Sequence, residues 1–362
     1  MAKNAGDTKG QGAMSRAAMR DVAALSGVSI ATVSRVLNGR PDVSPTTRAD
    51  VMRHIRELGY VSNRGTRARP NGHTGHTGHT GLISLSVPHL RGDYVAEIIA
   101  GAAEALEERN AHLVICSARK GVALDAPLRE RLLYGATDGA LLVLPDELSE
   151  ELVALYQDGY PLVVIDPVTP IHAEIPVVAT TNWAGAKMAT EHLIKLGHTH
   201  IGVIAGPAGW SGGADRLAGY QAALLAAGLP LTPTLVRQAD LTIDGGYEAA
   251  CHLLSLPHAA TAIFALNDSM AIGVLRAARE KGLDVPRELS VIGFDDMEIS
   301  SIMTPTLTTV RQPLQGLGRA GANVLYQLLF GQELDATRIE LSTKLVARES
   351  TAPPSGMSFM TY

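Results

Sequence analysis

The residues best equipped for chemistry near the start of the chain lie on one face of a short helical segment. Apolar Val33, Val36 and Leu37 recur at helical spacing. The opposite side of the segment carries residues that are mostly small or able to form hydrogen bonds: Ile30, Ala31, Ser34, Arg35 and Asn38. Such a helix can reach base edges in a DNA major groove, while neighbouring hydroxyls and arginines hold phosphates. A small helical bundle with an exposed polar face is the alternative interpretation.

Two further helices are predicted to position that face. Residues 19–26 have apolar spacing typical of a helix, and Gly27 supplies the tight turn that follows it. Ser29 is a good N-cap for the second helix, over residues 30–38. A third helix is predicted over residues 44–59, because a serine cap and then a proline begin it. Three helices in this order predict an all-α helix-turn-helix head.

Charge divides the chain in the same place. The net charge is −5, but residues 1–80 hold 12 Lys/Arg against 5 Asp/Glu, and the remainder holds 19 against 31. A basic head on an acidic body indicates that only the head meets a polyanion. Neither an apolar run of membrane-spanning length nor a secretory signal is found, and Cys116 and Cys251 are expected to be two buried, reduced thiols. We therefore expect a cytoplasmic protein.

The head also resembles a known family over some 45 ordered residues. The matching segments are Asp21-Val22-Ala23, Gly27-Val28-Ser29, Thr32-Val33-Ser34-Arg35-Val36-Leu37-Asn38, Val43-Ser44-Pro45-Thr46-Thr47-Arg48 and Leu58-Gly59-Tyr60-Val61-Ser62-Asn63-Arg64. This string is similar to the DNA-binding head of the lactose-repressor/galactose-repressor (LacI) family. One departure is Ala18, where the family often has a capping threonine.

The resemblance implies roles for individual residues of the head. Base reading is implied for Ile30, Ala31 and Arg35. The first two can offer only apolar contact, for instance to a thymine methyl, whereas Arg35 can fork onto a guanine. Contacts with the DNA backbone, or positioning on it, are implied for Ser29, Thr32, Ser34, Asn38, Thr47, Asn63 and Arg64.

The segment that follows the head departs from the family. Relatives continue with a short helix whose leucine wedges into the minor groove, but here Arg69 stands at that position and Pro70 stops a helix. An arginine that enters a narrow minor groove is the physical alternative.

A three-residue Gly-His-Thr repeat over residues 72–81 comes next. Its three histidines could hold a metal ion, but no cysteine or carboxylate lies nearby and ordering the tract would cost entropy. We interpret it as a solvated linker and predict no metal site and no cofactor.

Short apolar runs alternate with helical patterns from Leu82 onward, which predicts parallel sheets covered by helices on both faces. The expected strands are 82–87, 113–117, 140–144, 162–165, 177–180, 201–204, 235–238, 262–265, 290–294 and 307–311. Helices named between them are 95–108, 184–196, 215–227, 269–281 and 314–330.

The resemblance extends over this body, from Met19 to Thr351, and implies a two-lobed α/β core like a periplasmic binding protein. The matching motifs are Ala189-Thr190-Glu191-His192-Leu193, Arg216-Leu217-Ala218-Gly219-Tyr220, Ala265-Leu266-Asn267-Asp268, Val291-Ile292-Gly293-Phe294-Asp295-Asp296 and Leu307-Thr308-Thr309-Val310-Arg311-Gln312. Residues implied to face an effector are Asp166, Arg216, Asn267, Asp295 and Gln312, with Tyr94 and Trp210 as ring platforms. Carboxylates and a guanidinium suit vicinal hydroxyls, and an aromatic face suits the C–H face of a sugar. Leu241 stands where many relatives place an aromatic, which counts against a flat purine.

The predicted domains are a disordered arm (1–18), the head (19–62), hinge and linker (63–81), the core (82–352) and a disordered tail (353–362). Within the core, lobe 1 is expected over about 82–180 and 312–340, and lobe 2 over about 181–310 and 341–352.

An enzyme is disfavoured. Gly209-Trp210-Ser211-Gly212-Gly213 fits a hydrolase nucleophile elbow, but Gly206-Pro207-Ala208 separates it from the strand, more loop is expected after it, and no histidine follows His258. A secreted sugar-binding transport protein has no use for the head.

The sequence therefore predicts a sequence-specific transcriptional repressor, a homodimer on pseudo-palindromic double-stranded DNA, controlled by a small sugar and not membrane-bound. A bias of arginine over lysine is typical of a GC-rich genome and favours a plant-polysaccharide fragment such as cellobiose or xylobiose. A regulator that answers to a nucleoside or another metabolite, or that acts with a co-repressor, remains the alternative.

Overall fold

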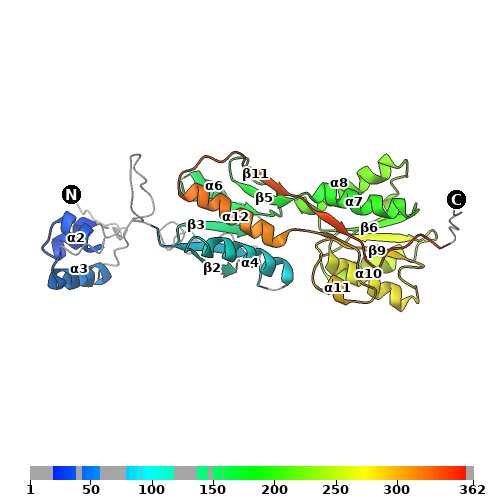
Figure 1. Cartoon of the computed structure of the whole chain (residues 1–362), viewed down its shortest axis with the longest axis horizontal. Coiled ribbons are helices and arrows are strands. Elements are labelled where there is room, and N and C mark those ends of the chain that lie inside the picture. Colours follow the sequence, from blue (N-terminus) through cyan, green and yellow to red (C-terminus); the bar gives the residue numbers. More distant parts are fainter. Residues whose placement is uncertain are drawn as a thin grey trace, which may run out of the picture. The chain divides into compact units, whose positions relative to one another are not determined.

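A computed structural model of the chain describes residues 19–37, 43–57, 79–90, 92–117, 137–145, 150–157 and 159–355 (Figure 1). Contacts within the chain separate two compact units, Met1–Gly78 (the head) and His79–Tyr362 (the core). Within the described ranges, no helix is long and apolar enough to cross a membrane.

The head is the predicted helix-turn-helix. Its helices are α1 (Met19–Leu25), α2 (Ile30–Leu37) and α3 (Pro45–Glu57), and Gly27 makes the first turn at a φ of 61°. Its buried apolar residues are Val22, Ala23, Val33, Val36 and Val51. The apolar stripe of α2 therefore faces the core of the head, and the opposite face stays in solvent.

Serine side chains fix where two of these helices begin. The Oγ of Ser29 accepts a hydrogen bond from the backbone N–H of Thr32 at 3.1 Å, and the Oγ of Ser44 accepts one from Thr47 at 3.1 Å. Each cap satisfies a donor that the first helical turn leaves without a partner.

Lobe 1 of the core is built on a six-stranded parallel sheet. In spatial order its strands are β11 (Arg338–Leu341), β5 (Val177–Thr180), β4 (Leu162–Ile165), β3 (Gly139–Val143), β1 (Leu82–Val87) and β2 (His112–Ser117). Helices α4 (Asp93–Glu107) and α12 (Leu314–Leu329) pack with Leu141 and Val143, while α6 (Glu150–Gln157) packs with Ala140 and Leu142. Alternate residues of β3 thus serve opposite faces, as a sheet covered on both sides requires.

Lobe 2 repeats this plan with a four-stranded parallel sheet. Its strands are β7 (Val236–Gln238), β6 (Ile201–Ala205), β8 (Ala262–Ala265) and β9 (Ser290–Ile292), and a short 3-10 turn, η1 (Pro233–Leu235), precedes β7. Its helices are α7 (Asn182–Lys195), α8 (Ser211–Ala226), α9 (Ile243–Leu253), α10 (Asp268–Glu280) and the short α11 (Ile299–Ile302). In Figure 1, α7 and α8 lie side by side, and α10 lies on the other side of the sheet.

The chain passes between the lobes three times. It leaves β5 for α7, leaves β10 (Thr309–Arg311) for α12, and leaves β11 for β12 (Lys344–Val346), which pairs antiparallel with β10. The crossing segments bond to one another, since Thr180 Oγ1 donates to Gln312 Oε1 at 2.6 Å and the Thr343 N–H donates to Thr181 Oγ1 at 3.0 Å. These bonds tie the three segments into one hinge.

The structure corrects several sequence-based boundaries. β11 and β12 were not predicted, and β9 ends at Ile292 instead of residue 294. Helix α8 begins at Ser211, not at residue 215, so no further loop follows the apparent elbow. The ring of Trp210 packs against Gly213 in the first turn of this helix. A Cβ added at Gly213 would lie 2.3 Å from that ring, so the position requires glycine. Cys116 and Cys251 are free but only half-buried, since β2 is an edge strand and α9 has an outer face.

Helices α4 and α12 approach each other through glycines. A Cβ added at Gly101 would lie 1.9 Å from the carbonyl oxygen of Gln315, and one at Gly318 would lie 2.0 Å from that of Ile98. Real Cβ atoms do not come so close to backbone, so each position requires glycine. The two helices therefore form one closely packed pair (Figure 1).

Gly318→Ala should lower the stability of the core by about 1–3 kcal/mol, because the new methyl group must push two backbones apart. Gly316→Ala is the matched control on the same helix, where the nearest atoms would lie 3.3 Å away. Its effect should stay within about 1 kcal/mol, since a small crowding cost is set against better helix propensity. Thermal unfolding of both variants checks this, and equal melting temperatures would contradict the close-packed pair.

Candidate functional site

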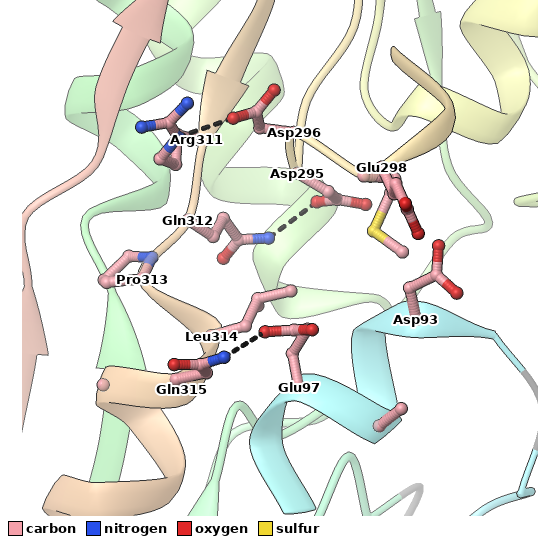
Figure 2. Close-up of a pocket in the computed structure, with 13 residues that line it drawn as sticks. Asp93, Glu97, Asp295, Asp296, Glu298, Arg311, Gln312, Pro313, Leu314 and Gln315 are labelled. Atoms are coloured by element: carbon pink, nitrogen blue, oxygen red, sulfur yellow. Dashed lines mark hydrogen bonds and ion pairs between the residues drawn. The ribbon is translucent and has the colours of Figure 1, made fainter. Parts of the chain in front are cut away.

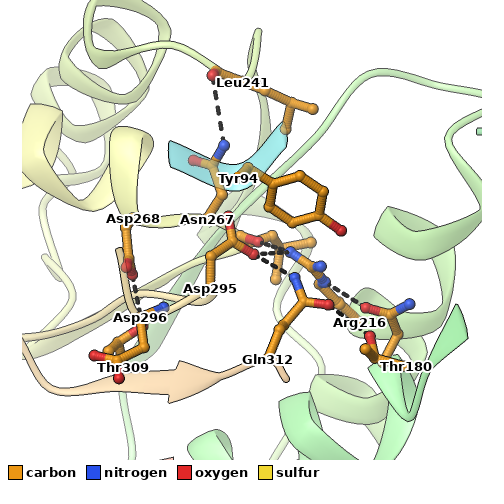
Figure 3. A network of polar contacts seen from close by, with 12 residues as sticks. Tyr94, Thr180, Arg216, Leu241, Asn267, Asp268, Asp295, Asp296, Thr309 and Gln312 are labelled. Carbon is orange, nitrogen blue, oxygen red and sulfur yellow. Dashed lines mark hydrogen bonds and ion pairs between the residues drawn. The ribbon is translucent and has the colours of Figure 1, made fainter. Parts of the chain in front are cut away.

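Polar side chains from both lobes meet at the hinge, where the strands of each sheet end. Lobe 1 contributes Tyr94 from the first turn of α4 and Asp166 directly after β4, while lobe 2 contributes Arg216 from α8 and Asp295 after β9. Gln312 lies on the second crossing segment. Figure 3 shows Tyr94, Arg216, Asp295 and Gln312 around one centre. Ligands bind at this edge in open α/β sheets.

The carboxylate of Asp295 is the common acceptor of this network. Its Oδ1 accepts a hydrogen bond from Gln312 Nε2 at 2.6 Å and lies 3.4 Å from Arg216 Nη1. Gln312 in turn accepts from Thr180, so one chain of bonds joins both lobes. A change in the separation of the lobes must therefore alter the surroundings of Asp295.

Arg216 is a buried support of the site and is 2% exposed. Its Nε donates to Asn182 Oδ1 at 2.8 Å, and its Nη1 donates to the carbonyl of Leu266 at 2.5 Å. The guanidinium stacks 3.7 Å from the ring centroid of Phe294 and 5.0 Å from that of Trp210. With most of its donors engaged, Arg216 mainly holds Asp295 and compensates its charge.

Asp166 and Tyr94 form a second pair, in which the tyrosine hydroxyl donates to the Oδ2 of Asp166. Burial raises the pKa of Asp166, although the Tyr94 hydrogen bond and the charge of Arg216 oppose that shift. Burial, followed by the charge of Asp166, raises the pKa of Tyr94 well above its ordinary value. The tyrosine hydroxyl is thus kept protonated and able to donate.

Backbone strain is concentrated at these carboxylates. Asp166, Asp295 and Asp296 have φ values of 48°, 117° and 59°, in a region that side-chain-bearing residues seldom adopt. Strain of this kind persists only where surrounding contacts impose it, and it is found at ligand sites.

Two neighbouring aspartates, Asp268 and Asp296, hold the segments around the polar centre in place and do not point into that centre. Asp268 is fully buried and accepts hydrogen bonds from Thr309 at 2.6 Å, Ser300 at 2.7 Å and the Met297 N–H at 2.8 Å. Asp296 pairs with Arg311 and, at 2.6 Å, with Arg348. The sequence shows both as polar residues at strand ends but does not show that they point away from the centre.

Asn267 and Trp210 also lie at the ends of lobe-2 strands. Asn267 caps α10, since its Oδ1 accepts the Met270 N–H at 2.8 Å, and its Nδ2 donates to the Leu241 carbonyl at 3.4 Å. Trp210 is half-buried between glycines and over Arg216. Asn267 thus has a structural task besides any ligand contact.

A groove with a volume of about 520 Å³ adjoins this centre and shares Asp295 and Gln312 with it (Figure 2). Its remaining charged lining residues are Asp93, Glu97, Asp296, Glu298 and Arg311. Five carboxylates against one guanidinium make it unfavourable for an anionic ligand. The described residues contain no group of side chains arranged to hold a metal ion.

In the head, the residues expected to read bases lie on the surface of α2. Ile30 is 53% exposed, and Ala31 and Arg35 are exposed beside it. Ser29 and Thr47 act in the helix caps, and the Thr32 hydroxyl lies 2.9 Å from that of Ser29. The side chain of Ser34 and the residues Asn38, Asn63, Arg64 and Arg69 lie outside the part that the structure describes.

A three-helix head of this kind and a two-lobed core of parallel sheets together define the architecture of a ligand-responsive bacterial regulator. Residues 18–63 match the family "Bacterial regulatory proteins, lacI family", and residues 190–351 match "Periplasmic binding protein-like domain". The transcriptional regulator CelR of Thermobifida fusca is 37% identical over 92% of this chain and 98% of its own, and the ribose operon repressor of Escherichia coli K12 is 34% identical over 92% and 99%. The chain belongs to the LacI family.

Solved structures agree with this assignment. A CelR–cellobiose complex has a TM-score of 0.70 at 35% identity and covers 92% of this chain and all of its own. The lac repressor dimer bound to operator and an anti-inducer has a TM-score of 0.66 at 28% identity and covers 93% and 100%.

Burial raises the pKa of Asp295 from 3.8 to about 7, although Arg216 opposes the shift. Between these values the native state holds a proton that the unfolded chain has lost, so this carboxyl favours folding at low pH and that contribution is lost as pH rises towards 7. The side chain of Asp295→Asn stays neutral at every pH. The melting temperature of this variant minus that of wild type should therefore increase from pH 5 to pH 8. Asp244→Asn is the exposed control, and a constant difference for Asp295→Asn would contradict the raised pKa.

Proposed function

We propose that this protein is a sequence-specific transcriptional repressor whose operator binding is controlled by a small, uncharged sugar in the interlobe site. The observation that supports this most is the polar centre that joins Asp166 of lobe 1 to Arg216 and Asp295 of lobe 2. Neutral hydroxyls can donate to such carboxylates and accept from neighbouring donors, whereas an added negative charge would be repelled. The cellobiose complex of CelR makes a β-linked disaccharide the first candidate.

The effector would favour one of two arrangements of the lobes. Asp295, Gln312 and Thr180 bridge the hinge, so a ligand that bonds to Asp295 in only one arrangement shifts the balance between them. A coupling of about 1–3 kcal/mol between effector and operator is typical of such systems.

The repressor is proposed to act in the cytoplasm as a homodimer on two half-sites. Edge strand β2 exposes Val114 and Ile115, which are 38% and 45% exposed, and α11 exposes Ile299 and Ile302, which are 43% and 66% exposed. Exposed large apolar side chains on a strand at the edge of the described sheet are typical of a surface that a second copy can cover. Two-fold symmetry then requires a pseudo-palindromic operator.

Arg35→Ala should lower affinity about 10- to 100-fold for a duplex that wild type selects from a random library, with little change on a scrambled duplex. The reason is that an exposed guanidinium on α2 can recognise a guanine only in the right sequence. Fluorescence anisotropy, which should also give two protomers per duplex, measures both affinities. Arg20→Ala, on α1, is the control and should not change discrimination between the two duplexes. Equal losses on both duplexes for Arg35→Ala would make Arg35 a phosphate contact.

Trp210→Ala should raise the cellobiose concentration that releases the selected duplex by at least about tenfold, because the sugar loses its aromatic platform. Operator affinity without sugar should stay near that of wild type. Trp183→Ala is the matched control, since this second tryptophan of the chain is 46% exposed on α7. Release of wild type by a purine or by ribose, and not by cellobiose, would move the proposal to another effector.

A further inference from the structure

The described part of the Gly-His-Thr repeat is bound to lobe 1 by one aspartate. The carboxylate of Asp138, directly before β3, accepts the Thr80 N–H at 2.7 Å, the Thr80 hydroxyl at 3.0 Å and the Gly81 N–H at 2.8 Å. The Nδ1 of His79 lies 3.9 Å from the same group, and the Asp138 side chain is only 9% exposed. Three hydrogen bonds to one carboxylate fix the backbone where the chain enters the core.

The last histidine of the repeat also has an aromatic partner. The ring of His79 lies 5.3 Å from that of Phe330, which in turn lies 4.6 Å from that of Tyr326. The guanidinium of Arg109 stacks 4.9 Å from the Tyr326 ring and donates to Asn323 at 2.8 Å. Phe330 is 53% exposed, so an aromatic ring in solvent is partly covered by the end of the linker.

Both helices of the close-packed pair run from the effector site to this docking place. Helix α4 begins at Asp93, beside Tyr94, and Arg109 follows its last turn. Helix α12 begins two residues after Gln312, and Phe330 is its C-cap. Because Gly101 and Gly318 lock the pair, the two helices move as one body with lobe 1.

We propose that Asp138 and Phe330 are positioning residues that dock residues 79–81 on lobe 1, and that this docking is required for tight operator binding. The inference rests on the proposed function as a DNA-binding repressor. A docked linker end fixes the point at which the chain leaves lobe 1 towards the head and so lowers the conformational entropy lost when both heads of a dimer bind one operator. In this proposal the histidine of the third repeat contributes through its ring, which lies against Phe330.

The test uses the full-length protein and a duplex selected by wild type from a random library. Asp138→Ala should weaken operator binding about tenfold, and His79→Ala and Phe330→Ala about threefold each, from the loss of a few weak contacts. The His79→Ala/Phe330→Ala double variant should bind as each single variant does, because both remove the same contact. Gln327→Ala, exposed on the same helix, is the control and should bind as wild type.

Two further measurements separate positioning from simple destabilisation. Cellobiose titration by tryptophan fluorescence and the melting temperature of the core should be unchanged in His79→Ala and Phe330→Ala, and Phe330→Tyr should restore binding. Hydrogen exchange at the Thr80 and Gly81 amides should be slow in wild type and fast in Asp138→Ala.

Each outcome decides one point. Fast exchange at both amides in wild type would overturn the docking, and unaltered operator affinity in Asp138→Ala despite fast exchange would overturn its role in DNA binding. If the losses of operator affinity in the two single variants multiply in the double variant, the His79–Phe330 contact is not what these residues contribute to binding. If wild type selects no sequence at all, the proposed function fails, while hydrogen exchange still decides whether the linker is docked.

Discussion

The buried pair of Arg216 and Asp295 is the interaction on which the rest of the core depends. Removing two charges from water is costly, and their attraction compensates only if the remaining hydrogen-bonding groups are satisfied. Here Asn182, the Leu266 carbonyl and Gln312 satisfy them, and the ring of Phe294 covers the guanidinium. These partners come from α7, from the ends of β8 and β9, and from a crossing segment, so the pair fixes the architecture of lobe 2 and its link to lobe 1.

Because the partners of Arg216 are structural, recognition of a ligand is left to the groups that remain partly accessible. Asp295 is 12% exposed, and burial raises its pKa to about 7, so its carboxyl can only accept hydrogen bonds when ionised but can also donate one when protonated. Tyr94 donates to Asp166, and the acidic groove begins at the far side of Asp295 and Gln312. Such a surface matches neutral hydroxyls, which can act as donors and acceptors, and disfavours phosphorylated or uronic sugars.

Much of this could be predicted from the sequence because the responsible signals are local. Gly27, Ser29 and the stripe of Val33 and Val36 specify the head, and apolar runs specify eight strands of the two parallel sheets nearly to the residue. Strand β11 was missed because its exposed and half-buried residues form an edge, where no apolar run is needed. The start of α8 was missed because its glycines serve the Trp210 ring, a contact that spacing does not reveal.

The candidate site was predicted less completely, and for a different reason. A strand-end aspartate can face a ligand, cap a helix or tie loops together, and the sequence signal is the same for all three. Asp295 faces the centre and Asn267 caps α10, whereas Asp268 and Asp296 bind Ser300 and Arg348 and hold the surrounding segments together. These roles differ although the four residues form two adjacent pairs in the chain, 267/268 and 295/296. At Asp295 and Asp296 the direction of the side chain depends on φ values of 117° and 59°, which are rare for residues other than glycine and which long-range contacts impose. The polar centre therefore lies at the hinge, where tertiary packing overrides local preference.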